Sequence, residues 1–248
     1  MGYEGQKLGT GSGVIARDTD GQLYLVTALH NLSARKPGQN MPISPSGGLP
    51  NQLCVEGSDL KFEANLYAGE NDPNTDPPFY CTHESGSAID VTILRVPAAT
   101  RVYYPLDSSF LIPRYNSELP LRVGQTCYVV GFPEELIHRP FENALLPIWK
   151  TGNIASEPLF DFVNEPKLLI DCTTRRGMSG AMVVVSEQGR NRLVGIYSGR
   201  YKQTSAADTY EDNRNFTTEL GWVYRSEIIR ELIRGSSRKN RLRERFGA

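Results

Sequence analysis

Short runs of apolar, β-branched and aromatic residues recur along the chain, and turn residues separate them. Gly13–Ala16 is followed by an Asp-Thr-Asp-Gly turn at Asp18–Gly21 and by the apolar run Gln22–Thr27, which predicts a β-hairpin. The further strand candidates are Leu60–Tyr67, Ile89–Val96, Thr126–Val130, Lys150–Ala155, Lys167–Cys172, Ala181–Val185 and Arg192–Tyr197. These runs do not alternate with helical patterns, as βαβ units would require. The pattern therefore predicts an all-β barrel or sandwich.

A clear helical pattern occurs only near the C-terminus. A helix is predicted with Ser226 as its N-cap and Gly235 as its stop. Its apolar face consists of Ile228, Ile229, Leu232 and Ile233. From Arg225 onward the chain carries eight basic and three acidic residues. This basic tail favours a solvated chain end, and the alternatives are a docking tail for a regulatory partner or a link to an additional domain.

Three polar segments rich in turn residues predict surface loops, namely Lys36–Asn51, Gly69–Pro78 and Gln203–Glu219. Pro113–Pro120 lies near the middle of the sequence and is placed to join two halves. The length of 248 residues fits one large domain or two small domains that share a core.

Composition and charge exclude several classes of function. Lys and Arg number 27 and Asp and Glu number 28, and this net charge of −1 argues against a general nucleic-acid binder. A membrane span is not predicted, because the chain lacks a run of about 18 apolar residues. Met1–Gln6 lacks the basic and apolar regions of a signal peptide, so we expect a cytoplasmic protein.

The four cysteines are spread along the chain at Cys54, Cys81, Cys127 and Cys172. They form no CxxC pair, so no zinc site, other metal or cofactor is predicted. A chain of this length can build a core without disulfides. We therefore expect four free thiols in a reducing compartment.

The most informative local sequence is Arg-Arg-Gly-Met-Ser-Gly at Arg175–Gly180, between two apolar runs. A serine flanked by glycines fits a tight turn that exposes its hydroxyl. The N–H groups of Gly177 and Ser179 can then point at one spot, as an oxyanion hole requires. The same residues also fit a plain β-turn.

Two further segments carry groups that can activate a serine. His30 follows an apolar run, and the chain has only three histidines. Asp90 lies inside the apolar segment Ser87–Leu94, where an unpaired carboxylate would be costly. Asp90 therefore needs a hydrogen-bond partner, for which His30 is a candidate.

In this order the segments resemble the trypsin/chymotrypsin-like serine peptidase family. The residues that carry the resemblance are Gly11–Ile15, Thr27–His30, Asp90–Leu94, Val129–Pro133, Gly177–Gly180 and Leu193–Gly199. The order His, Asp, Ser belongs to this family. The sequence is most similar to the bacterial, non-zymogen branch with the Deg-type and glutamyl-endopeptidase relatives. An α/β-hydrolase needs a histidine after its serine, and none follows His138.

The resemblance implies two six-stranded antiparallel Greek-key β-barrels with a C-terminal helix. The first barrel would span residues 1–118 and carry His30 and Asp90. The second would span residues 119–224 and carry Ser179, and residues 225–248 would form the helix and the basic tail. The implied activity is a serine endopeptidase acting on protein or peptide substrates, with Ser179 as nucleophile, His30 as general base and Asp90 holding the imidazole.

The resemblance also bears on activation and specificity. Digestive relatives carry an acidic residue where this chain has Met178, so activation through a salt bridge at that residue is not expected. The primary specificity pocket is assigned to Thr173, Thr174, Tyr197, Ser198 and Gly199. Thr173 stands where relatives that cut after Arg or Lys place a carboxylate, so cleavage after these residues is not expected. Trp222 is placed either to narrow the pocket or to pack behind it.

Two other functions remain compatible with the same sequence. One is a catalytically silent module of this fold that binds proteins. The other is a regulated protease domain of a larger protein, to which the basic tail would be the link. The complete set of His30, Asp90 and Ser179 favours the enzyme, because degenerate members usually lose one of the three.

Overall fold

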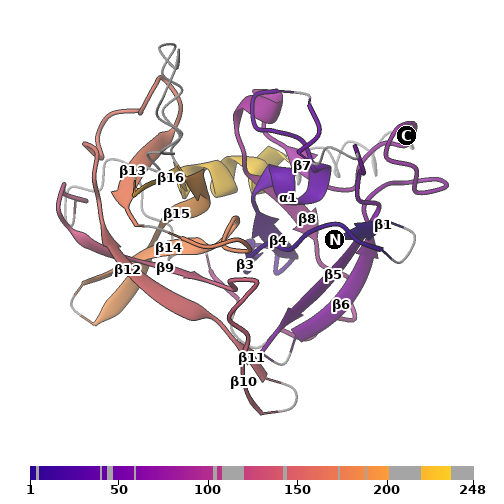
Figure 1. Ribbon diagram of the computed structural model, residues 1–248, viewed down its shortest axis with the longest axis horizontal. Helices are drawn as coiled ribbons and strands as arrows, with labels where there is room; N and C mark the ends of the chain where they lie inside the picture. Colours follow the sequence, from indigo (N-terminus) through magenta and orange to yellow (C-terminus); the bar gives the residue numbers. More distant parts are fainter. Residues whose placement is uncertain are drawn as a thin grey trace, which may run out of the picture.

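The computed structural model describes residues 1–3, 6–39, 41–43, 47–58, 60–102, 105–107, 120–141, 144–172, 174–187, 189–200 and 219–235. The regular secondary structure of these residues is mostly strand, and the antiparallel sheets confirm the predicted all-β class (Figure 1). The strands of the first half are β1 (Gly2–Tyr3), β2 (Gln6–Lys7), β3 (Gly13–Arg17), β4 (Leu23–Thr27), β5 (Gln52–Gly57), β6 (Leu60–Asn65), β7 (Cys81–Thr82) and β8 (Thr92–Arg95). Two short helical segments lie among them, α1 (Leu29–Ser33) and the 3-10 turn η1 (Gly86–Ala88).

The second half of the chain forms one closed sheet. Its strands are β9 (Thr126–Gly131), β12 (Ile148–Asn153), β13 (Lys167–Asp171), β14 (Met182–Glu187), β15 (Arg190–Arg200) and β16 (Leu220–Arg225), in the order β12-β9-β14-β15-β16-β13. A bridge between Ile154 and Ile170 joins the two edges. Val183 and Val185 are fully buried in its interior, because alternate residues of a strand point to the same face.

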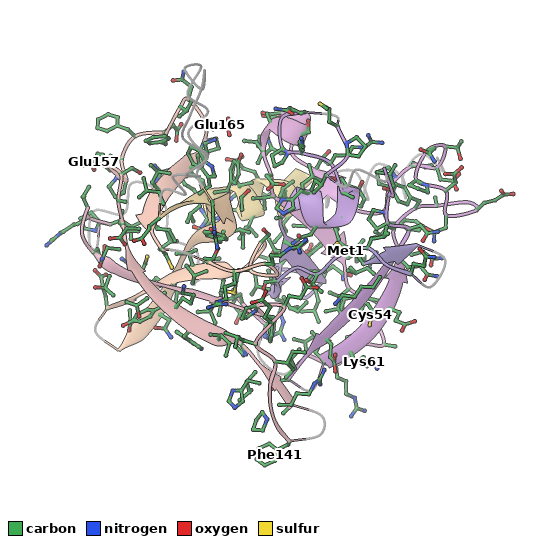
Figure 2. The ribbon with its side chains drawn as sticks, in the orientation of Figure 1. Met1, Cys54, Lys61, Phe141, Glu157 and Glu165 are labelled. Atoms are coloured by element: carbon green, nitrogen blue, oxygen red, sulfur yellow. The ribbon has the colours of Figure 1, made fainter. Side chains whose placement is uncertain are left out.

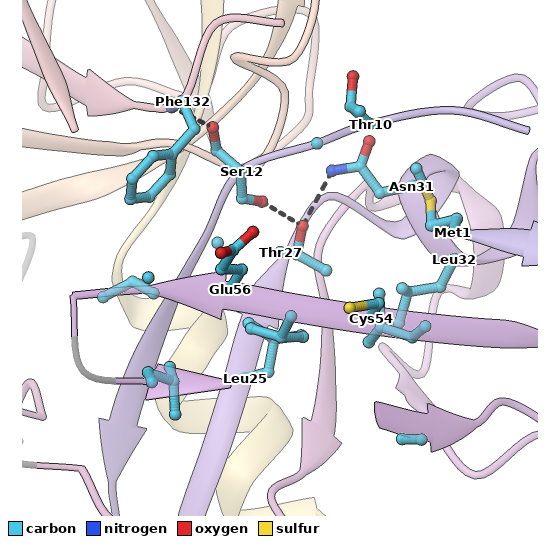
Figure 3. Close-up of a pocket in the computed structure, with 18 of the residues that line it drawn as sticks. Met1, Thr10, Ser12, Leu25, Thr27, Asn31, Leu32, Cys54, Glu56 and Phe132 are labelled. Carbon is cyan, nitrogen blue, oxygen red and sulfur yellow. Dashed lines mark hydrogen bonds between the residues drawn. The ribbon is translucent and has the colours of Figure 1, made fainter. Parts of the chain in front are cut away.

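The strands of the first half lie in two sheets, of order β2-β1-β5-β6 and β3-β4-β8-β7. Two sheets therefore replace the single six-stranded sheet implied for this half, because β3 and β6 are sheet edges that do not pair with each other, and the outer edge of β3 pairs with Leu106 instead. A cleft of about 1210 Å³ opens between β3 and β5, with Ser12, Thr27 and Asn31 at one end (Figure 3).

A shared core joins the two halves. Tyr24 and Ile93 from the first half pack in one cluster with Val130 and Leu193 from the second. The predicted C-terminal helix is confirmed over residues 227–235, and its apolar residues Ile228, Ile229 and Leu232 are buried in this same cluster. The helix therefore packs along the seam, the boundary between the two halves. No helix among the described residues is both long and apolar enough to cross a bilayer.

A hairpin of β10 (His138–Phe141) and β11 (Ala144–Leu146) projects from the second half (Figure 2). Phe141 near its tip is 77% exposed. Both guanidinium nitrogens at the end of Arg139 bind the carboxylate of Glu56 on β5, at 2.8 and 2.9 Å. This ion pair connects the hairpin to the first half of the molecule. The predicted joint at Pro113–Pro120 and the basic tail beyond residue 235 lie outside the described residues, apart from Pro120 itself.

All four cysteines are free in the structure. Burial raises the pKa of the Cys127 thiol to about 12, and burial also raises the pKa of Cys172. Cys54 is exposed on β5. Since the thiolate is the reactive form, iodoacetamide at neutral pH is expected to label Cys54 in the folded protein and to leave Cys127 unmodified. Mass spectrometry of tryptic peptides checks this, and modification of Cys127 as fast as Cys54 would contradict it, with all four reacting in denaturant as the control.

Candidate active site

His30 lies in α1, directly after β4, and its ring faces Asp90. Its Nδ1 lies 2.6 Å from Oδ2 of Asp90, and its backbone N–H donates to Oδ1 of the same carboxylate at 2.8 Å. The predicted pairing of His30 with Asp90 is therefore confirmed. The side chain of His30 is 17% exposed, whereas that of Asp90 is 1% exposed. The imidazole thus joins a buried carboxylate to a surface that a substrate can reach.

Asp90 is satisfied by donors from both halves of the molecule. It lies between η1 and β8, and the hydroxyl of Ser198 on β15 donates to its Oδ2 at 2.5 Å. Three groups thus bind the carboxylate, as burial of a charge requires. Ser198 was assigned to the specificity pocket, but the structure directs its side chain to Asp90. Its hydroxyl therefore holds the carboxylate in place.

The turn that carries Ser179 depends on two glycines. Gly177 and Gly180 have φ angles of +87° and +88°, a region that L side chains rarely adopt. A Cβ at Gly177 would lie 2.6 Å from the carbonyl oxygen of Phe132, and one at Gly180 would lie 2.0 Å from that of Ser12. Any larger residue at either position would displace the turn.

The orientation of one peptide bond decides whether an oxyanion hole exists. The carbonyl oxygen of Arg176 accepts a hydrogen bond from the backbone N–H of Glu134 at 2.9 Å. In a trans peptide the C=O and the following N–H point in opposite directions. The N–H of Gly177 therefore points away from Glu134. It donates to none of the described residues. This orientation leaves it available to an oxyanion.

The turn is fixed to the half of the molecule that carries His30. The carbonyl oxygen of Ser179 accepts from the backbone N–H of Ser12 and from Nδ2 of Asn31, each at 2.8 Å. Since Asn31 follows His30 in α1, these bonds bring Ser179 to the helix of the imidazole. The described contacts include no hydrogen bond between the Ser179 hydroxyl and His30, and such contacts are often long in ligand-free enzymes.

The residues assigned to the specificity pocket differ in their placement. Thr173 lies outside the described residues. Thr174 and Tyr197 are 3% and 1% exposed, and the hydroxyl of Thr174 donates to that of Tyr197 at 2.7 Å. A Cβ at Gly221 would lie 2.4 Å from the Tyr197 ring, so this ring occupies the space beside Gly221. Gly199 faces open space.

Trp222 packs outside this group. Its ring meets that of Phe162 edge to face with the centroids 5.5 Å apart, and the ammonium of Lys167 lies 4.1 Å from its ring centroid. Of the two placements considered for Trp222, these contacts favour packing behind the pocket. The described residues contain no group of three or more side chains able to hold a metal ion.

The polar residues that hold the turn, above all Ser12 and Asn31, carry no motif from which their role could be predicted. Ser12 lies within the segment that carried the family resemblance, yet its hydroxyl had no assigned role. In the structure this hydroxyl donates to the carbonyl of Gly177 at 2.7 Å and accepts from the N–H of Phe132 at 2.8 Å. The proximity of Asn31 to His30 was the only signal that pointed to that residue.

Comparisons with known proteins identify the family of the chain. The chain matches the trypsin-like peptidase domain family over residues 11–196. No curated protein matches it significantly. A solved structure of Rv3671c protease in an inactive form is 17% identical, with 91% of this chain and 82% of that chain covered and a TM-score of 0.47. A serine-to-alanine mutant of Rv3671c from M. tuberculosis H37Rv, also in an inactive form, is 18% identical, with 91% and 80% covered and a TM-score of 0.47. Because the family match spans well over half of the sequence, the chain belongs to the family of trypsin-like peptidase domains.

Proposed function

We propose that the chain is a serine endopeptidase that cleaves protein or peptide substrates through Ser179, His30 and Asp90. The observation that carries the proposal is the bond between His30 Nδ1 and Asp90, next to a turn that holds Ser179 against the same helix. With its Nδ1 proton bound by Asp90, the imidazole presents Nε2 as a base. A serine hydroxyl needs such a base, because it is essentially un-ionised at neutral pH.

The proposed reaction has two stages. Ser179 Oγ attacks the scissile carbonyl carbon while its proton passes to His30 Nε2. The oxyanion then accepts hydrogen bonds from the N–H groups of Gly177 and Ser179. His30 returns the proton to the leaving amine as the C–N bond breaks, which gives an acyl-enzyme. Water then attacks the ester, with His30 again taking and returning a proton.

A fluorophosphonate probe tests this proposal directly. It phosphonylates an activated serine, so the folded chain is expected to take up one equivalent at Ser179, identified by peptide mapping. An absence of labelling in protein that is folded by circular dichroism would favour the silent binding module instead.

We further propose that the enzyme is made in an active form, in keeping with the bacterial, non-zymogen branch. Met178, which stands where zymogen relatives carry an acid, is fully buried in the core of the second half. A thioether at this position supports the turn by packing and needs no charged partner. The turn is therefore expected to be ordered without prior cleavage of the chain.

For specificity we propose a shallow, polar pocket for the substrate residue that precedes the cleaved bond. The Tyr197 ring beside Gly221 reduces the depth of the pocket. Burial raises the pKa of Tyr197 to about 12, so its hydroxyl keeps its proton at neutral pH. This hydroxyl accepts from Thr174 and has one proton left to donate. The guanidinium of Arg200 binds the carbonyl of Thr174, with Nε at 3.0 Å.

Small or polar residues at this substrate position, including Gln and Glu, are therefore expected to be cleaved faster than Lys or Arg. A lysine or arginine would lose hydration there, and the pocket residues Thr174, Tyr197 and Gly199 offer no counter-charge. Cleavage of a peptide library, read by mass spectrometry, checks the order. Tyr197→Phe keeps the ring and removes the donor, so it should weaken the preference for Gln and Glu only. Dominance of Lys and Arg in the library would refute this pocket.

A further inference from the structure

A closed set of polar contacts surrounds the carbonyl of Ser179, and Asn31 is at its centre. Figure 3 shows the members Ser12, Thr27 and Asn31. Nδ2 of Asn31 donates to the Ser179 carbonyl oxygen at 2.8 Å and to Oγ1 of Thr27 at 2.9 Å. The Thr27 hydroxyl in turn donates to the carbonyl oxygen of Ser12 at 2.6 Å. The backbone N–H of Ser12 donates to the same Ser179 carbonyl oxygen, so the contacts form a closed ring.

The chemistry of these partners fixes the orientation of the Asn31 amide. The Ser179 carbonyl can only accept a hydrogen bond. The Thr27 hydroxyl has already given its one proton to Ser12, so it too can only accept here. Both contacts therefore require the NH₂ group of Asn31, and neither could be made by an oxygen atom that carries no hydrogen.

Burial makes these bonds costly to lose. Ser12, Thr27 and Asn31 are 4%, 3% and 5% exposed. A Cβ at Gly11 would lie 2.3 Å from Nδ2 of Asn31, so the backbone at Gly11 closes over the amide. Among the described residues, the other donor to the Ser179 carbonyl is the N–H of Ser12. The side chain of Asn31 is thus one of two links that hold the nucleophile's main chain to the half that carries His30.

We propose that Asn31 is a positioning residue for the nucleophile, which acts by donating to the Ser179 carbonyl across the seam between the two halves. This inference rests on the proposed peptidase function. It assigns to Asn31 the placement of Ser179 Oγ relative to His30, and it leaves the bond between His30 and Asp90 unchanged. A misplacement of about 1 Å at a reacting atom costs on the order of 100-fold in rate.

Two substitutions separate donation from packing. Asn31→Asp keeps the shape of the side chain but turns carboxylate oxygens toward two acceptors. Asn31→Ala removes the side chain. A donor role predicts that both variants react with the fluorophosphonate at least about 10-fold more slowly than the parent chain, with Asn31→Asp no faster than Asn31→Ala. A packing role predicts that Asn31→Asp resembles the parent chain.

Two readouts accompany the labelling rate. In Asn31→Ala, the pH midpoint of that rate should match the parent chain, because the His30–Asp90 pair is intact. Hydrogen exchange, read by mass spectrometry, should become faster over residues 177–181 in both variants. The matched control is Asn71→Ala, which removes another amide side chain that binds a main-chain group, the N–H of Tyr67 at 3.0 Å. The rate at which this control variant reacts with the fluorophosphonate should lie within about twofold of the rate of the parent chain.

The outcomes distinguish the two claims. Slower labelling together with faster exchange over residues 177–181 supports the positioning role. Unchanged exchange over these residues, or labelling equal to that of the Asn71→Ala control, overturns it. If the parent chain itself fails to label, the peptidase function is wrong, and the exchange data alone then decide whether Asn31 holds the turn.

Discussion

Ser179→Ala is expected to reduce kcat by about 10⁴-fold or more while the protein stays folded. The substitution removes the attacking oxygen, and the remaining groups cannot form an acyl-enzyme. The side chain of Ser179 makes none of the described hydrogen bonds, and the bonds that hold the turn go to its carbonyl oxygen. Loss of the hydroxyl should therefore leave the turn in place. Initial rates on a peptide substrate and the melting temperature, measured on the same preparation, test both halves of the prediction.

Ser186→Ala is a suitable control, because it makes the same chemical change on β14, at an exposed position. Its rate should match that of the parent chain. Turnover by Ser179→Ala within about tenfold of the parent would exclude Ser179 as the nucleophile. A large fall in its melting temperature would instead show that the hydroxyl supports the fold.

Asp90→Asn is expected to cost about 10⁴-fold in kcat, although the change is nearly isosteric. The backbone N–H of His30 faces Oδ1 of Asp90 and can only donate. The oxygen of the new amide must therefore take this position, which places its NH₂ at the former Oδ2, beside His30 Nδ1. Nδ1 must then accept, so the proton moves to Nε2. An imidazole with a proton on Nε2 cannot take the proton of Ser179.

Kinetics and NMR can separate this tautomer effect from unfolding. The imidazole nitrogen signals of the folded variant should show the proton on Nε2, and kcat should fall. Asp72→Asn is the matched control, because Asp72 is an exposed carboxylate that binds only neighbouring groups of its own loop. An Asp90→Asn variant that keeps more than about a tenth of the parent rate would show that His30 does not depend on this carboxylate for its tautomer.

The elements predicted best from sequence are those whose local pattern and final burial agree. The β3–β4 hairpin follows its two apolar runs and its Asp18 turn, in which the Asp18 carboxylate accepts from the N–H groups of Asp20 and Gln22. The partner of Asp90 could be anticipated because a carboxylate in an apolar strand has few ways to avoid a large desolvation cost.

Other elements depend on contacts that no local pattern records. β5 was not predicted, because Gln52, Cys54 and Glu56 alternate with only two branched apolar residues, and its partner strand supplies the rest. Asn31 and Ser12 were missed because their partners lie 148 and 165 residues away in sequence. The depth of the pocket could not be predicted, because it depends on the Tyr197 ring filling the space that Gly221 leaves, 24 residues away in sequence.

The proposed catalytic residues come from both halves of the molecule, so the rate of hydrolysis depends on how the halves pack together. Ser179 lies in the turn that precedes β14 of the closed six-stranded sheet, whereas His30 and Asp90 belong to the half whose strands are divided between two smaller sheets. One buried cluster packs Ile93 of the first half with Val130 and Leu193 of the second, so a substitution that weakens this cluster would shift the nucleophile relative to its base. Such a substitution would lower the rate of hydrolysis although every catalytic side chain is unchanged.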